Sequence, residues 1–277
     1  MKTKITLGFS PCPNDTFIFD ALVNRKIENK DFEFELKIAD VEELNKMILN
    51  SELDVSKISY HLYPFVNENY QILNSGSALG NNNGPILISK HKIYLDEINN
   101  LKIAIPGKYT TANLLFSIFF PNAKNKHEYL FSDIEEVILS NEVYAGLIIH
   151  ETRFTYMKHG LKKIIDLGEK WENEMKQPLP LGGISIKRTI REDIKLKINN
   201  LISSSVKHAF ENPLGTYNYI KQYSQSLSEE VIQNHINLYV NNFTIDLKEK
   251  GRNSIETLFK KAIENKLVPE LKSKIFI

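Results

Sequence analysis

The first sixty residues alternate strand-like and helix-like hydrophobic patterns, and this alternation restricts the fold more than any other feature of the chain. Residues 4–9 (KITLGF) and 53–59 (LDVSKIS) are typical of buried strands, and residues 31–40 alternate apolar and polar side chains as a half-buried strand does. One segment with helical spacing follows residues 4–9, and another follows residues 31–40. The order strand, helix, strand, helix, strand predicts an α/β fold with a doubly wound, largely parallel sheet.

A second set of such patterns follows a loop rich in glycine, asparagine and serine at residues 75–85. Residues 101–107 and 144–151 are predicted strands, and an apolar helix follows the first of them. From residue 190 onward the apolar side chains recur at helical spacing. The chain therefore has two α/β sets followed by helices.

Two strand candidates that begin with glycine, GPILISK and GGISIK, separate these sets. Their placement favours interleaved lobes joined by two strands that cross side by side. We expect lobe one to comprise residues 1–89 and 186–277, and lobe two residues 90–185. The cleft between the lobes is the expected place for a small ligand.

The composition excludes several classes of function. The chain has 35 Lys and Arg against 34 Asp and Glu, interspersed along its length, so nothing indicates a nucleic-acid partner. No apolar run approaches the roughly 20 residues of a membrane-spanning helix, and the N-terminus lacks the apolar core of a signal peptide. The single cysteine fits a reducing compartment, and no metal-ligand motif is present. We expect a cytoplasmic protein with no nucleic-acid or membrane partner; protein partners cannot be inferred.

Ligands of doubly wound sheets bind beyond the carboxyl ends of the strands, where this chain has three polar segments. The candidate residues there are Asn14, Asp15, Thr16, Ser56, Lys57, Ser59, Lys108, Thr110 and Thr111. The two threonines stand at a helix start, where unpaired N–H groups suit a carboxylate or phosphate. Each segment also has an alternative interpretation without function. Residues 14–16 would then belong to a stiff turn, Lys57 and Ser59 would be solvated side chains, and the threonines would form an ordinary N-cap.

His150 ends the apolar strand predicted over residues 144–151, and it is the best candidate for a catalytic residue. Histidine is the commonest general base near neutral pH, and a histidine at a strand end between two lobes faces the cleft. The alternative is a surface or capping histidine. Glu151 is a candidate to orient the ring, although adjacent residues on a strand point to opposite faces. His208 and His235 lie in helical patterns and are expected to have packing roles.

Six segments, taken together, resemble one known family. They are SPCPNDTFIFDAL, DVSKISYHLYPF, SGSALGNNNGPILIS, IAIPGKYTTANLL, GLIIHE and QPLPLGGI, in this order between about residues 5 and 190. They are similar to segments of the 1,4-dihydroxy-6-naphthoate synthases of the futalosine route to menaquinone. The resemblance implies a fold like that of the type 2 periplasmic binding proteins and no metal or organic cofactor. It also implies a lyase that converts cyclic dehypoxanthinyl futalosine, a small carboxylate, to 1,4-dihydroxy-6-naphthoate and dihydroxyacetone.

The resemblance also implies roles for particular residues. The family's proton acceptor falls on His150. Its substrate contacts fall on Lys57, Ile58, Ser59, Thr110 and Thr111. We interpret the segment of Asn14, Asp15 and Thr16 as a cleft wall stiffened by proline and lined by polar side chains.

Three alternatives stay open at this point. One is a chorismate dehydratase of the same pathway and fold. Another is a non-catalytic protein that binds small carboxylates, which normally carries a signal peptide. The third is a hydrolase with Cys12 as nucleophile, although no histidine lies near Cys12 in the sequence and a structural role is favoured.

Overall fold

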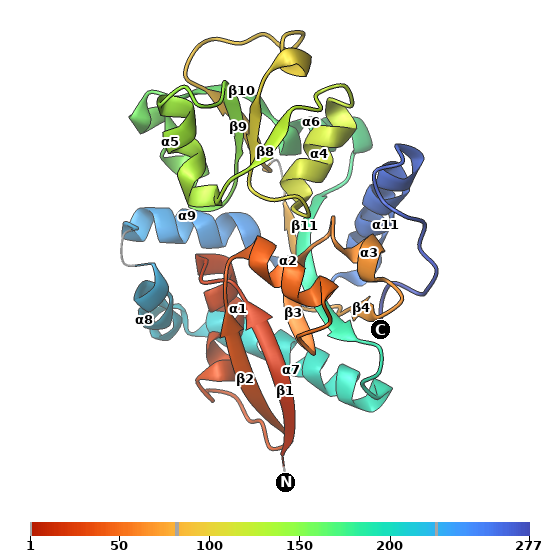
Figure 1. Cartoon of the computed structure of the whole chain (residues 1–277). Helices are drawn as coiled ribbons and strands as arrows, with labels where there is room; N and C mark the ends of the chain where they lie inside the picture. The colour runs from red at the N-terminus through yellow and green to blue at the C-terminus, as the bar shows by residue number, and fades with distance from the viewer. Residues whose placement is uncertain (1, 81–82, 225–226) are drawn as a thin grey trace.

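The computed structural model describes residues 2–80, 83–224 and 227–277, and it has two sheets, one above the other in Figure 1. The strands of the first sheet are β1 (Thr3–Phe9), β2 (Phe32–Ile38), β3 (Val55–Ser59), β4 (Tyr70–Ile72), β5 (Ala78–Gly80) and β11 (Leu179–Lys187). Those of the second are β6 (Ile86–Ser89), β7 (Ile103–Ile105), β8 (Lys126–Glu128), β9 (Ala145–Ile148) and β10 (Lys162–Asp166). We call the parts built on these sheets the first and the second lobe.

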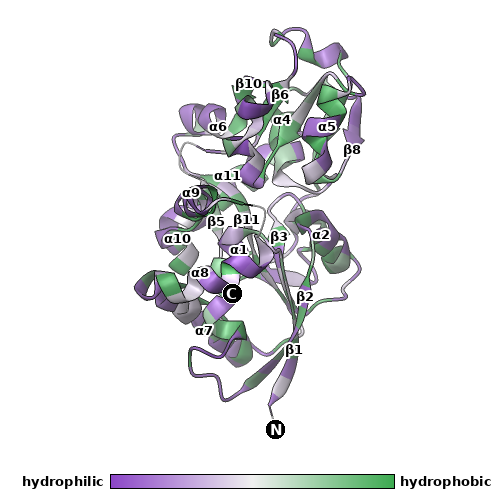
Figure 2. Ribbon diagram, turned by 90° about the vertical axis from the view of Figure 1, so that its left-hand side faces the viewer, coloured by the Kyte–Doolittle hydropathy of each residue, from purple (hydrophilic) through white to green (hydrophobic). Residues whose placement is uncertain are grey.

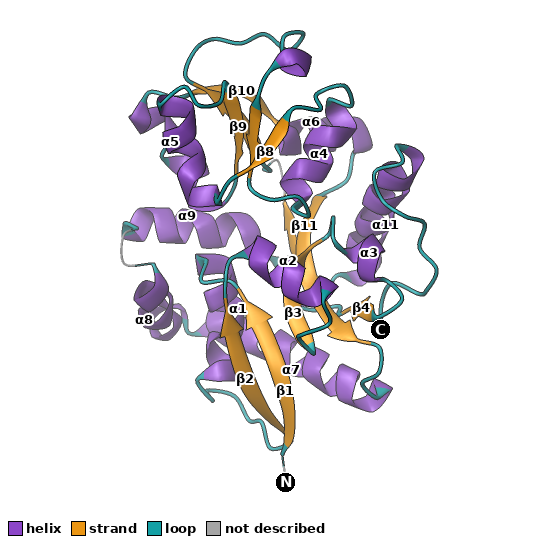
Figure 3. Ribbon diagram, in the orientation of Figure 1, coloured by secondary structure: helices purple, strands orange, loops and turns teal. Residues whose placement is uncertain are grey.

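Helices flank both sheets (Figure 3). The α-helices are α1 (Pro13–Val23), α2 (Val41–Leu49), α3 (Tyr63–Val66), α4 (Thr111–Phe119), α5 (Ile134–Leu139), α6 (Leu167–Met175), α7 (Glu192–Glu211), α8 (Pro213–Tyr223), α9 (Glu229–Tyr239), α10 (Asn242–Ile245) and α11 (Lys248–Glu264). The short 3₁₀ helices are η1 (Ile98–Asn100), η2 (Phe131–Asp133), η3 (His150–Phe154) and η4 (Tyr156–His159). Helices α7 and α8 pack on α1, and α9 contacts α1, β5 and η3.

The predicted alternation of strands and helices is confirmed, but both sheets are mixed rather than largely parallel. The strand order is β2-β1-β3-β11-β4 in the first sheet, with β5 also on β11, and β10-β6-β9-β7-β8 in the second. Strand β1 is parallel to β2 and β3, as expected for strands joined by helices. Strand β11 returns from the second lobe and runs antiparallel to β3, β4 and β5.

The predicted pairing of GPILISK with GGISIK is wrong. The first segment contains β6, which pairs with β9 and β10 in the second sheet, whereas the second lies in β11 and pairs in the first. The strand beside the start of β11 is β5. Gly84 marks close backbone packing instead of a strand start, because a Cβ there would lie 2.6 Å from Cα of Gly168.

Interleaving of the lobes remains our proposal, with different boundaries. Strand β6 belongs to the second sheet, so lobe two begins before residue 90. Strand β11 belongs to the first sheet over its whole length, so lobe two ends before residue 179 and not at residue 185. The C-terminal helices α7 and α8 lie against α1 of the first lobe, which supports this division.

Apolar residues gather along the sheets and the helix faces that cover them (Figure 2). One buried cluster contains Ile58 of β3, Leu87 of β6 and Phe259 of α11, so the lobes share a continuous apolar contact. Within the described ranges, no helix combines the length and the apolar character needed to cross a membrane.

Candidate active site

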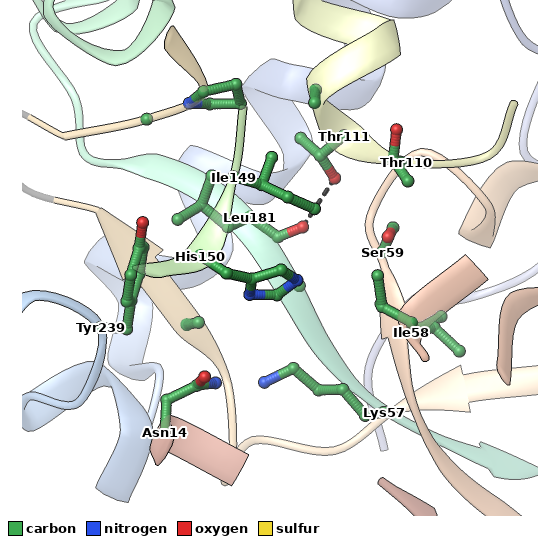
Figure 4. A pocket seen from close by; sticks show the side chains of 16 residues that line it. Asn14, Lys57, Ile58, Ser59, Thr110, Thr111, Ile149, His150, Leu181 and Tyr239 are labelled. Carbon is green, nitrogen blue, oxygen red and sulfur yellow. Dashed lines mark hydrogen bonds between the residues drawn. The ribbon is translucent and has the colours of Figure 1, made fainter. Parts of the chain in front are cut away.

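A pocket lies between the lobes and brings together residues from all three predicted segments (Figure 4). The space among its side chains, including the open mouth, measures about 630 Å³. The lining residues are Asn14, Val41, Lys57, Ile58, Ser59, Ala78, Gly84, Pro85, Thr110, Thr111, Ala112, Ile149, His150, Leu181, Gly182 and Tyr239. Aliphatic side chains form much of the wall, and a few polar groups converge on it, as in small-molecule sites generally.

The strand predicted over residues 144–151 is shorter in the structure: β9 ends at Ile148, and His150 begins η3 just beyond it. Its backbone is left-handed, with φ of 57°, a conformation that is uncommon for residues other than glycine. Its ring lies 5.0 Å from the ring of Phe131, edge to face, and 6.1 Å from that of His235, nearly parallel. The Nε2 atom is buried and has no hydrogen-bond partner among the described residues. An unpartnered ring nitrogen beside a pocket is suited to exchange a proton with a bound molecule.

Lys57 enters the pocket from β3 as half of a buried ion pair. Its Nζ lies 2.9 Å from Oδ1 of Asp15, and both side chains are almost completely buried. The other oxygen of Asp15 accepts hydrogen bonds from the backbone N–H and the hydroxyl of Ser10, at 3.2 and 2.7 Å. Asn14 donates from Nδ2 to Oδ1 of Asp15 at 2.8 Å. These contacts hold the lysine and the asparagine at one side of the pocket.

Of the predicted wall residues, only Asn14 reaches the pocket lining. Helix α1 begins at Pro13, with Cys12 as its N-cap. As a result, Asp15 lies beneath the lining, against Lys57. The hydroxyl of Thr16 donates within the first helical turn, to the backbone carbonyl of Cys12 at 3.0 Å.

Ser59, at the end of β3, is held by Asn45 of α2. The backbone N–H of Ser59 donates to Asn45, whose Nδ2 in turn donates to the serine hydroxyl at 3.1 Å. No described residue accepts the hydroxyl proton, so it remains available to a ligand. Asn45 also donates from Nδ2 to Glu42, which in turn accepts from the backbone N–H of Tyr109 in the second lobe, both at 3.0 Å. The glutamate fits there because Gly107 has no Cβ, which would lie 2.5 Å from its Cγ.

Thr110, Thr111 and Ala112, at the start of α4, line the pocket. Both threonine hydroxyl protons are committed: Thr110 donates to the carbonyl of Gly107 at 2.8 Å, and Thr111 to that of Leu181 at 2.6 Å (Figure 4). The N–H groups of Thr111 and Ala112 lie in the first helical turn and have no acceptor within the helix. The oxygen-binding groups at this end are therefore the backbone amides, with the hydroxyls as acceptors.

His61 and Cys12 lie outside this pocket. His61 contacts the carbonyl of Thr110 through Nδ1 at 3.1 Å, and burial lowers its pKa to about 4. Cys12 is buried, and burial, followed by the nearby charge of Glu151, raises the pKa of its thiol well above the usual value. These surroundings disfavour the thiolate that a cysteine nucleophile needs.

Sequence reasoning missed two residues of α9, His235 and Tyr239. Tyr239 lines the pocket, and burial raises the pKa of its hydroxyl to about 12. His235 is completely buried, with Nε2 2.9 Å from Oδ1 of Asn14. Burial, with the nearby charges of His150 and Lys57, lowers the pKa of His235. Both residues occupy apolar positions of an ordinary helical pattern, so no local signal distinguished them.

The described ranges contain no group of three or more His, Cys, Asp or Glu side chains placed to hold a metal ion.

Comparison with protein families finds one match that spans most of the chain. The model of a menaquinone biosynthesis family matches residues 5–264. The chain is 39% identical over 258 residues to a 1,4-dihydroxy-6-naphthoate synthase of Thermus thermophilus, a match that covers 93% of each protein. It is 34% identical over 272 residues to the enzyme of the same name from Streptomyces coelicolor, covering 96% of this chain and 95% of that protein.

Solved structures share the fold. Protein AF1704 of Archaeoglobus fulgidus superimposes with a TM-score of 0.90 at 33% identity, over 96% of this chain and 98% of that one. The alkanesulfonate-binding protein SsuA of Xanthomonas axonopodis superimposes with a TM-score of 0.72 at 9% identity, over 98% and 96%. The predicted periplasmic-binding-protein-like fold is thereby confirmed.

Proposed function

The chain belongs to the menaquinone biosynthesis family, which includes the 1,4-dihydroxy-6-naphthoate synthases, and from this premise we propose that it is such a lyase, with His150 as its general base. The substrate is then cyclic dehypoxanthinyl futalosine, and the products are 1,4-dihydroxy-6-naphthoate and dihydroxyacetone. The substrate carries a carboxylate on an aromatic ring and a spiro-fused ring derived from a sugar. Its size and mixed polarity suit a pocket with aliphatic walls and few polar groups.

The reaction breaks a carbon–carbon bond heterolytically, so a proton must leave and the resulting negative charge must be delocalised. His150 removes the proton through Nε2 and, as an imidazolium, returns it as the two products form, so no net proton is lost. The electron pair of the broken bond enters the naphthalene system, and formation of its second aromatic ring supplies driving force. Dihydroxyacetone departs as the three-carbon fragment. No part of this scheme needs a nucleophile, which leaves Cys12 without a chemical role.

The remaining polar groups hold the substrate for this step. The N–H groups at the start of α4 suit an anionic oxygen, because they lie at the positive end of a helix dipole. The free hydroxyl proton of Ser59 and the ammonium of Lys57 are the other donors at the lining. Ile58, Ile149 and Leu181 supply apolar surface for the aromatic ring. Holding the reacting bond near Nε2 in this way contributes to the rate by fixing its orientation.

One observation carries this proposal: the Nε2 atom of His150 is buried beside the pocket and has no partner among the described residues. His150→Gln should fold, bind the substrate and lose about 10²- to 10⁴-fold in kcat, the usual contribution of a general base. His159→Gln is the matched control, because His159 lies in the same lobe, is half exposed and pairs with Glu135 at 2.8 Å. Near-wild-type kcat in His150→Gln would place the base elsewhere.

An activity assay with two substrates separates the lyase from the alternative functions. Purified protein is incubated with cyclic dehypoxanthinyl futalosine and, separately, with chorismate. Release of dihydroxyacetone from the first supports the lyase. Turnover of chorismate alone would support the dehydratase, and binding without turnover of either would support a solute-binding protein. The curated relatives, both named as synthases, favour the first outcome.

We also propose a cytoplasmic location, supported by the reduced single cysteine and tested by cell fractionation.

A further inference from the structure

His235 has neighbours that fix which of its ring nitrogens carries the proton. The two oxygens of Asp15 act as acceptors, toward Lys57 on one side and Ser10 on the other. The group of Asn14 that faces Asp15 must therefore be its NH₂, at 2.8 Å. The amide oxygen of Asn14 then faces Nε2 of His235 at 2.9 Å, and because an amide oxygen only accepts, Nε2 carries the proton.

The other ring nitrogen, Nδ1, is consequently a bare lone pair. It is buried and has no hydrogen-bond partner among the described residues. The ring is completely buried, and burial together with the nearby positive charge of Lys57 opposes its protonation. His235 is thus a neutral imidazole of one tautomer at the centre of the protein.

This ring is one of two that enclose the ring of His150. Phe131, from η2 of the second lobe, lies edge to face on it at 5.0 Å, and His235, from α9, lies nearly parallel at 7° and 6.1 Å. The backbone of His150 is left-handed and does not by itself favour this placement. The two flanking rings therefore help to hold the imidazole at the pocket.

We propose that His235 is a positioning residue for His150: held as a neutral Nε2–H imidazole by Asn14 and Asp15, it fixes the ring of the base without placing a second positive charge beside it. The proposal rests on the proposed role of His150 as general base. A charged neighbour would oppose proton uptake by His150, and a neighbour free to rotate would leave its ring less well oriented.

Two substitutions at position 235 separate positioning from packing. His235→Gln keeps a neutral N–H donor for Asn14 but is polar and flexible at a fully buried place. His235→Phe keeps a flat ring and apolar packing but leaves the oxygen of Asn14 without its donor. For positioning by a hydrogen-bonded ring, we expect kcat to fall about tenfold or more in both variants, with KM little changed, because Gln lacks the ring and Phe lacks the bond to Asn14. For packing alone, His235→Phe would stay within about threefold of wild type, and only His235→Gln would lose activity.

A double-mutant cycle completes the test. Because His235 acts through His150, His235→Phe should cause little further loss of kcat in a His150→Gln background. Circular dichroism and thermal melting of every variant show whether it is folded. The full tenfold loss appearing again in that background would overturn the inference and leave the base intact. Near-wild-type kcat in His150→Gln alone would instead overturn the proposed function, so the two failures are distinguishable.

Discussion

The hydroxyl of Thr111, at the start of α4, donates a hydrogen bond of 2.6 Å to the backbone carbonyl of Leu181 in β11. This bond joins the two lobes directly across the pocket. Two more contacts reach the same short segment of the second lobe from the first. Glu42 accepts from the N–H of Tyr109, and His61 contacts the carbonyl of Thr110. The segment before α4 is therefore one place where hydrogen bonds join the two lobes.

Thr111→Val should weaken substrate use, because it keeps the shape of the side chain but removes the hydroxyl that bonds to Leu181. Loss of one such bond costs on the order of 1–3 kcal/mol, so kcat/KM should fall about 5- to 150-fold. Steady-state kinetics measure this. Thr257→Val is the control, because the hydroxyl of Thr257 makes a similar bond, to the carbonyl of Asn253, on the exposed face of α11. Unchanged kinetics in Thr111→Val would show that this bond does not contribute to substrate use.

The buried pair of Lys57 and Asp15 should behave as a coupled unit in unfolding. Removing one partner of such a pair leaves a buried charge unpaired and typically costs about 3–5 kcal/mol. We expect a loss of this order in the free energy of unfolding for Lys57→Met and for Asp15→Asn, measured by urea denaturation. The double variant should lose clearly less than the sum of the two. Strict additivity would mean that the two charges do not depend on each other.

Cys12→Ser should keep most of the activity. The thiol is buried, its pKa is raised by that burial, and serine is well suited to the N-cap position that Cys12 occupies in α1. Steady-state kcat and the rate of thiol alkylation in the native protein are the measurements. A loss of several orders of magnitude in a folded Cys12→Ser variant would restore the nucleophile hypothesis.

Stability should fall as the pH is lowered below the ordinary pKa of histidine. Burial lowers the pKa of His61 from 6.5 to about 4, so between these values the unfolded chain binds the proton and the folded protein does not. The free energy of unfolding should therefore decrease from about pH 6.5 to about pH 4, by up to about 3 kcal/mol from His61 alone. His235 acts in the same direction, because its pKa is also lowered.

His61→Gln should flatten this decrease without abolishing it, since the contribution of His235 remains. Urea denaturation at a series of pH values gives the slope. His91→Gln, at an exposed position, is the control and should leave the slope unchanged. A slope in His61→Gln as steep as in wild type would show that His61 is not the residue responsible.

The sequence predicted those parts of the molecule that depend on local pattern. Strands β1, β2 and β3 were recognisable because their side chains alternate or form short apolar runs between helical segments. His150 was found because it follows a buried strand. The carboxyl ends of neighbouring strands lie at one edge of a sheet, where ligands bind. A residue at a strand end can therefore be placed near the binding site from the sequence alone.

The parts that could not be predicted depend on contacts between distant segments. Strand β5 has three residues, too few to show a period, so the crossing was assigned to the wrong segment. His235 occupies a helical position that any buried residue could fill. Its place beside Asn14, 221 positions earlier in the chain, follows only from the packing of α9 on α1 and η3.

The left-handed backbone of His150 has a consequence for protein engineering. A histidine at φ of 57° carries strain of order 1–3 kcal/mol, and its buried Nε2 adds the cost of an unpaired polar atom. Glycine or asparagine would occupy the position with less strain. Selection of variants for heat resistance alone would therefore tend to replace His150 early, and a stabilised enzyme has to be sought by a screen that also demands turnover.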